Sequence, residues 1–147
     1  SSADAKNHAD YLCDNTTDIN SWHYTVDENI IYHHLPDEEV GWHAGDKQTE
    51  GGGNMTGGGI EMCVNKGSDF DRTLDNAAKL TASLLEAYDL RIEDVRKHQD
   101  FSGKNCPAHL LNDESWKEFL NLVKSYVDKV KSDAARRFLS YLIVVLI

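Results

Sequence analysis

Apolar residues recur at helical spacing in three segments of the chain. Residues 1–14, 71–88 and 114–131 carry apolar side chains three or four positions apart, the pattern of a helix with one buried face. In the third segment they form one continuous stripe made of Trp116, Phe119, Leu120, Val123, Tyr126, Val127 and Val130. We therefore predict a helix in each of these segments.

Shorter segments rich in β-branched and aromatic residues predict strands. Residues 21–27 and 30–34 are separated by a short polar turn, which favours a β-hairpin. Residues 59–64 predict a third strand. Because side chains alternate between the faces of a strand, Glu61 and Cys63 are expected to share one face of it.

The order of these elements predicts the fold class. Residues 41–58 contain one Gly-Gly-Gly run, at 51–53, and the start of a second, at 57–59, and predict a loop, and residues 95–100 predict one more short strand. The resulting order is helix, hairpin, strand, helix, strand and helix. It favours an α/β fold in which a mixed central sheet is flanked by helices.

The end of the chain has a different character from the rest. Residues 138–147 are almost entirely apolar, but a helix needs about 20 such residues to span a bilayer. Their β-branched pairs favour a buried strand or the start of a further segment. We divide the chain into a domain of residues 1–131 and a linker with an apolar tail, residues 132–147.

Composition narrows the class of function. The 147 residues suffice for one domain, and 40% apolar with 27% charged residues is typical of a globular protein. The net charge of −10 argues against a nucleic-acid partner, because phosphate binding needs clustered Lys and Arg. Three widely spaced cysteines do not indicate a disulfide framework, and the first residues show no secretory signal pattern.

One stretch carries residues suited to a metal. His98 is expected at the end of a short strand and Cys106 lies just past a Ser-Gly turn, so the two side chains can converge. Imidazole and thiolate are both good zinc ligands. Taken alone, the pair is equally compatible with a surface histidine and a buried thiol.

Five short motifs, which follow one another along most of the chain, indicate a relationship to a known family. They are KNH at 6–8, SWHYTVD at 21–27, VGWHAGD at 40–46, GIEMC at 59–63 and HQDFSGKNC at 98–106. Through them the chain resembles the type 2 amidase and peptidoglycan recognition family, which includes amidase-type phage lysozymes and bacterial autolysins. The resemblance covers the chain from Ala5 to about Val127.

The resemblance implies roles for particular residues. His98 and Cys106 match two zinc ligands, Glu61 matches a general acid–base and Lys104 matches an oxyanion-stabilising lysine. Without the resemblance, Glu61 would be a solvated carboxylate and Lys104 an ordinary turn lysine. The resemblance also implies that Trp42 contacts the substrate. His23 and His43 are implied either to contact the substrate or to support the zinc ligands from behind.

The predicted function follows from these roles. It is zinc-dependent hydrolysis of the amide bond between N-acetylmuramic acid and L-alanine in bacterial peptidoglycan, by a monomer acting outside the cytoplasm without inserting into a membrane. The alternatives are a non-catalytic peptidoglycan-binding module on the same fold and a small structural zinc protein. A structural zinc site would need four ligands.

The sequence departs from the family at its start. The family begins with a central strand that ends in a histidine, the first zinc ligand, and here that strand and ligand have no match. We therefore expect weak zinc binding and low activity. Two interpretations compete, an incomplete sequence and a permuted fold in which residues 141–147 fill the vacant strand as a continuous apolar run.

Overall fold

The computed structural model describes residues 3–15 and 17–145, with side chains described as far as residue 133. The main elements are α1 (Ala5–Asp14), β1 (Tyr24–Val26), β2 (Ile31–His33), α2 (Gly53–Thr56), β3 (Ile60–Met62), α3 (Phe70–Ala87), α4 (His98–Ser102) and α5 (Asp113–Val145). Single 3₁₀ turns lie at Ile92–Asp94 and Ala108–Leu110. Among the described residues, no helix is both long and apolar enough to cross a membrane.

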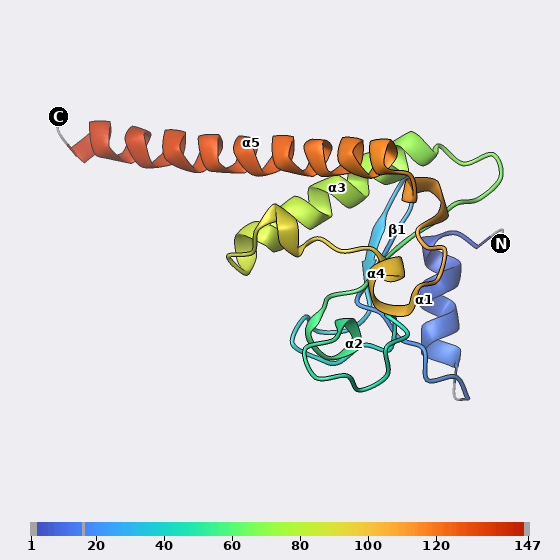
Figure 1. Ribbon diagram of the computed structural model, residues 1–147. Helices are drawn as coiled ribbons and strands as arrows, with labels where there is room; N and C mark the ends of the chain where they lie inside the picture. Colours follow the sequence, from blue (N-terminus) through green and yellow to red (C-terminus); the bar gives the residue numbers. More distant parts are fainter. Residues whose placement is uncertain (1–2, 16, 146–147) are drawn as a thin grey trace.

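The three strands form one mixed sheet with the order β2-β1-β3. Strand β1 pairs antiparallel with β2, which confirms the predicted hairpin, and parallel with β3. In the parallel pair Thr25 lies opposite Glu61. The predicted mixed α/β architecture is therefore present, with helices packed around a small sheet (Figure 1).

Strand β1 is buried on both of its faces. Val26 lies in the main apolar core with side chains of α3 and α5. Thr25 points to the opposite face, where its hydroxyl accepts a hydrogen bond of 2.7 Å from Nε1 of Trp22. The Trp22 ring stacks on Tyr11 of α1, so α1 covers this second face.

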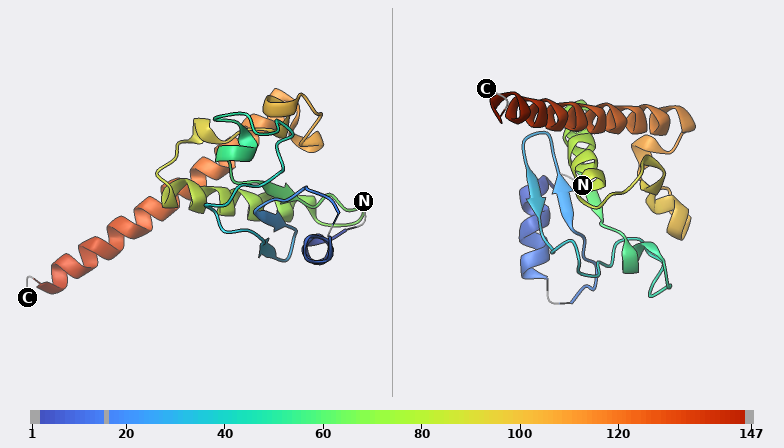
Figure 2. Two further views of the ribbon diagram at one scale, coloured as in Figure 1. Left: turned by 90° about the horizontal axis from the view of Figure 1, so that it is seen from below. Right: turned by 90° about the vertical axis from the view of Figure 1, so that its left-hand side faces the viewer.

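The main core lies between the sheet and two long helices. Helices α3 and α5 pack on each other, and α5 continues beyond α3, away from the sheet (Figures 1 and 2). The buried residues of this core are Val26, Ala77, Ala78, Ala82, Leu85, Leu110, Phe119 and Val123. Small alanines on α3 let α5 approach closely, and the larger side chains of α5 fill the space.

Asp27, the residue directly after β1, connects this strand to the start of α1 and to the hairpin turn. Its side chain is 4% exposed, and Oδ2 accepts a 3.0 Å hydrogen bond from the backbone N of Ala5, where α1 begins. Its Oδ1 accepts from the backbone N–H groups of Asn29 and Ile30 and so shapes the hairpin turn. Burial raises the pKa of this carboxyl, but the three backbone donors outweigh it and hold the pKa below its usual value.

Three local predictions are wrong. Residues 95–100 form no strand, because His98 begins helix α4 instead. Cys63 does not share the exposed face of Glu61: β3 ends at Met62, and Cys63 turns into the interior at 2% exposure. The predicted loop 41–58 contains the short helix α2.

The apolar tail does not fill a vacant strand. Helix α5 includes the tail as far as Val145, outside the three-stranded sheet, so the permuted interpretation of residues 141–147 is wrong for 141–145, while 146–147 lie outside the described residues. Helical hydrogen bonds that continue from a well-packed segment outweigh the β-propensity of a short apolar run. The helix also runs without a break across residues 131 and 132, where the domain division remains a prediction.

We expect Asp27→Asn to lower the free energy of unfolding by about 1–3 kcal/mol, because an amide nitrogen would face the buried N–H of Ala5. Because the pKa of Asp27 is lower in the folded than in the unfolded chain, its carboxylate stabilises the fold above about pH 4. This contribution is lost as the pH falls through the folded-state pKa. The native chain should therefore lose stability more steeply below about pH 4 than the variant does. Urea unfolding between pH 3 and 7 measures both effects. Asp10→Asn on the exposed face of α1 is the control, and an equal loss there would contradict this role of Asp27.

Candidate active site

The loop after α4 brings two potential metal ligands toward each other. His98 is the first residue of α4, and the residue after the helix, Gly103, caps it in the left-handed conformation with φ 72°. The chain then returns, and the carbonyl of Cys106 accepts a 3.0 Å hydrogen bond from the backbone N of Gln99. His98 and Cys106 are both half-buried and lie on the same small, closed loop.

Strand β3 places a carboxylate beside this loop. Glu61 is exposed in the middle of β3, while its neighbours Ile60 and Met62 pack against the core. The alternation of a strand thus turns Glu61 toward solvent on the face opposite to α3.

Glu61 and Lys104 each influence both His98 and Cys106 electrostatically. Burial lowers the pKa of His98, the positive charge of Lys104 lowers it further, and Glu61 opposes both. Burial likewise raises the pKa of the Cys106 thiol, Glu61 raises it further and Lys104 opposes them. Glu61 and Lys104 therefore lie near both His98 and Cys106, and we refer to these residues as the four-residue group.

The loop before α2, residues 41–52, lies next to His98, and we call it the wall loop. At Gly45, where φ is 73°, an added Cβ would lie 3.4 Å from Nε2 of His98 and 3.1 Å from Cβ of Ser102. The loop is therefore in close contact with α4, and its glycine accommodates both the backbone conformation and the contact.

Asp46 and Asn54 give this loop its shape. Asp46 Oδ2 accepts a 2.6 Å hydrogen bond from the backbone N of Gly53. Asn54 is 2% exposed, and its Oδ1 accepts from the backbone N–H groups of His43 and Ala44. Sequence reasoning missed both residues. The one available signal was that Asp and Asn often bond to nearby backbone in loops.

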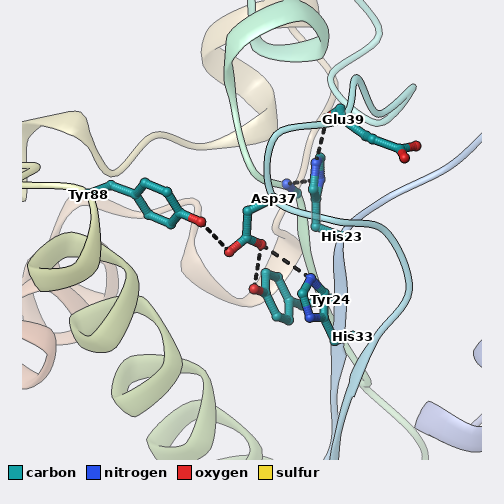
Figure 3. A network of polar contacts seen from close by, with 7 residues as sticks. His23, Tyr24, His33, Asp37, Glu39 and Tyr88 are labelled. Carbon is teal, nitrogen blue, oxygen red and sulfur yellow. Dashed lines mark hydrogen bonds and ion pairs between the residues drawn. The ribbon is translucent and has the colours of Figure 1, made fainter.

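His23 is placed where it cannot touch a substrate. Its side chain is completely buried, Nδ1 accepts a hydrogen bond from the backbone N of Gly59, and Nε2 donates to the carbonyl of Glu39 (Figure 3). Both ring nitrogens are thus used within the protein. This burial argues against the expected substrate contact of His23, and its supporting position behind the ligands remains a prediction.

His43 and Trp42 are half-buried in the wall loop. His43 Nε2 donates to the carbonyl of Gly57 at 2.9 Å, and burial lowers the pKa of the ring, with His23 and His98 lowering it further. The interaction with His98 places His43 at the margin of the four-residue group. The backbone N of Trp42 donates to the hydroxyl of Ser21, which ties the loop to the segment before β1.

The chemical type of the two potential ligand atoms suits zinc. A histidine nitrogen and a cysteine sulfur are ligands that zinc prefers, and His98 and Cys106 supply one of each. Within the described part of the chain, no group of three or more His, Cys, Asp or Glu side chains has an arrangement that could hold a metal ion. The structure thus presents two donors of the right chemistry rather than a complete ligand set.

Known proteins resemble this chain over most of its length. Residues 1–109 match the N-acetylmuramoyl-L-alanine amidase family. The chain is 44% identical over 123 residues to N-acetylmuramoyl-L-alanine amidase CwlH of Bacillus subtilis, covering 84% of this chain and 48% of CwlH. It is 44% identical over 117 residues to N-acetylmuramoyl-L-alanine amidase XlyA of the same organism, covering 80% of this chain and 38% of XlyA. The chain therefore spans less than half the length of either relative.

Solved structures show the same fold. The catalytic domain of XlyA superposes with a TM-score of 0.76 at 41% identity, covering 82% of this chain and 76% of that one. The structure of PlyL superposes with a TM-score of 0.78 at 31% identity, covering 86% of this chain and 79% of that one. With the family match over most of its length, this chain belongs to the N-acetylmuramoyl-L-alanine amidase family.

Proposed function

We propose that this chain hydrolyses the amide bond between N-acetylmuramic acid and L-alanine in bacterial peptidoglycan. The observation that carries the proposal is that Glu61 and Lys104 each lie close enough to both His98 and Cys106 to shift their pKa values, so that a carboxylate and an ammonium stand near two potential zinc ligands. The names of the relatives support the same reaction. A substrate in the cell wall would place this activity outside the cytoplasm.

His98 and Cys106 are the residues that would hold a zinc ion. Bound zinc supplies Lewis-acid polarisation of a carbonyl oxygen and makes a neighbouring water more acidic. The half-buried position of both side chains limits competition from bulk water. A third protein ligand is not proposed among the described residues, since none of their side chains completes the set.

Glu61 is proposed to move the proton. As the water oxygen bonds to the amide carbon, the carboxylate accepts a proton from that water. As the carbon–nitrogen bond breaks, the same proton passes to the leaving amine of L-alanine. An exposed carboxylate on a short strand that pairs with β1 suits this role, because it is fixed at its backbone and free at its oxygens.

Lys104 is proposed to stabilise the negative charge that develops on the carbonyl oxygen. Its ammonium is exposed and close enough to both His98 and Cys106 to shift their pKa values. A positive charge fixed near a developing oxyanion lowers the barrier more than it strengthens ground-state binding. His43 and Trp42 are proposed to line the adjoining substrate-binding surface.

A non-catalytic peptidoglycan-binding module is the second candidate. The observation in its favour is that the described residues lack a three-ligand group. A pure binder, however, has no use for a carboxylate next to a thiol and a histidine. The two candidates differ in what they predict for bound zinc and for turnover.

Zinc content tests the ligand pair. After equilibrium dialysis against a zinc concentration below saturation, we expect the purified chain to hold zinc weakly, and Cys106→Ser to lower the bound zinc by at least about tenfold, because a hydroxyl is a much poorer zinc ligand than a thiolate. Elemental analysis measures this loss. Cys13→Ser, which alters an exposed thiol on α1, is the matched control and should keep its zinc. Equal zinc in both variants would contradict the assignment.

Turnover tests the carboxylate. We expect Glu61→Gln to lower kcat by about 10²–10⁴-fold while zinc content stays the same, because the amide cannot accept the proton. The assay counts the L-alanine amino termini released from purified peptidoglycan. Glu118→Gln on the exposed side of α5 makes the same chemical change away from the site and should have native activity. A native chain that binds peptidoglycan but releases no amino termini would favour the binding module.

A further inference from the structure

Two histidines hold the glycine segment that leads into β3. His23 Nδ1 accepts a 3.0 Å hydrogen bond from the backbone N of Gly59, and His43 Nε2 donates a 2.9 Å hydrogen bond to the carbonyl of Gly57. The carbonyl of Gly59 accepts from the backbone N–H groups of His23 and Tyr24, at 3.1 and 2.9 Å. Residues 57–59 are therefore held by side chains as well as by the backbone of β1.

The two imidazole rings occupy the space next to two glycines. They meet edge to face, with centroids 5.7 Å apart and planes at 80°. A Cβ added to Gly59 would lie 2.6 Å from Cγ of His43, and one added to Gly41 would lie 2.8 Å from Cδ2 of His43 and 2.9 Å from Cε1 of His23. The rings can pack this closely only because both backbone positions lack a side chain.

The other side of His23 is anchored as well. Because Nδ1 accepts a hydrogen bond, Nε2 carries the proton, and it donates to the carbonyl of Glu39 (Figure 3). The loop of Glu39 is fixed by Asp37, whose carboxylate accepts hydrogen bonds from the hydroxyls of Tyr24 and Tyr88. His23 therefore connects the start of β3 with a loop that is hydrogen-bonded to β1 and to the residue directly after α3.

We propose that His23 and His43 form a positioning pair that sets the location of Glu61 relative to His98, Lys104 and Cys106. Gly59 directly precedes β3, and Glu61 lies two residues further on, so a shift of Gly59 moves the carboxylate. The inference rests on the proposed function of Glu61. Displacing a catalytic group by about 1 Å can cost about 10²-fold in rate, so such support matters even though neither ring touches the reacting atoms.

Two substitutions of His23 separate its two hydrogen bonds. The amide oxygen of Asn lies near the place of Nδ1, so His23→Asn can keep the bond to Gly59 and lose that to Glu39. The amide of Gln reaches the place of Nε2, so His23→Gln can keep the bond to Glu39 and lose that to Gly59. We expect the Gln variant to have a kcat about tenfold below that of the Asn variant, with KM and zinc content similar in the two.

A readout independent of activity accompanies the kinetics. Amide hydrogen exchange of Gly59, measured by NMR, should accelerate at least about tenfold more in the Gln variant than in the Asn variant, because only the Gln variant loses the acceptor of that N–H. Both variants replace the same imidazole ring by a side-chain amide, so the temperature of thermal unfolding should change by a similar amount in the two. Equal kcat in the two variants, or equal exchange of Gly59, would overturn the inference.

A pair of glycine substitutions tests the packing and serves if the His23 variants do not fold. Gly59→Ala should lower kcat by about 10–100-fold with little change in KM, because its Cβ would displace the His43 ring or β3. Gly58→Ala is the control, because an added Cβ there meets no atom within 4 Å, and it should have native kcat. Native kcat in Gly59→Ala would overturn the inference. If the native chain shows no amidase turnover, the proposed function fails. The amide hydrogen exchange of Gly59 would still test whether His23 fixes the start of β3.

Discussion

The arrangement depends on one three-residue strand that is buried on both faces. Strand β1 has a buried polar side chain directly before it and another directly after it. At its start His23 bonds to Gly59 and Glu39, and at its end Asp27 bonds to Ala5 and to the hairpin turn. Since buried polar groups are costly unless paired, these contacts determine where α1, β2 and β3 lie relative to β1.

The candidate site occupies the edge of this rigid centre. Glu61 stands on β3, which is held by β1, whereas His98 and Cys106 lie on a small loop closed by one backbone hydrogen bond. The wall loop packs on α4 through Gly45. Reactive side chains are thus exposed or half-exposed, while the groups that fix their backbones are buried. This separation lets a small domain combine a precise geometry with access for the large polymeric substrate that we propose.

The sequence by itself determined the helices, the hairpin and the mixed sheet, because burial of one face leaves a regular spacing of apolar residues. It also indicated His98, Cys106, Glu61 and Lys104, since these residue types stand within motifs that resemble a known family. Short elements were predicted less well. The segment before His98 contains β-branched and polar residues in an order that allows a strand or a turn, whereas the short helix α4 depends on Asp100, which caps its start, on Gly103, which caps its end, and on the backbone hydrogen bond from Gln99 to Cys106.

Only the tertiary structure decided what the remaining polar residues do. His23 and His43 stand in similar aromatic motifs, yet one is completely buried between two backbone groups and the other borders the site. Asp37 and Tyr88 meet across 51 positions of the chain. Hydrogen bonds between distant segments have no periodic signature, because each requires only one donor and one acceptor brought together by the packing of other residues. Periodicity therefore predicts the elements, whereas the contacts that position Glu61 exist only once those elements are assembled.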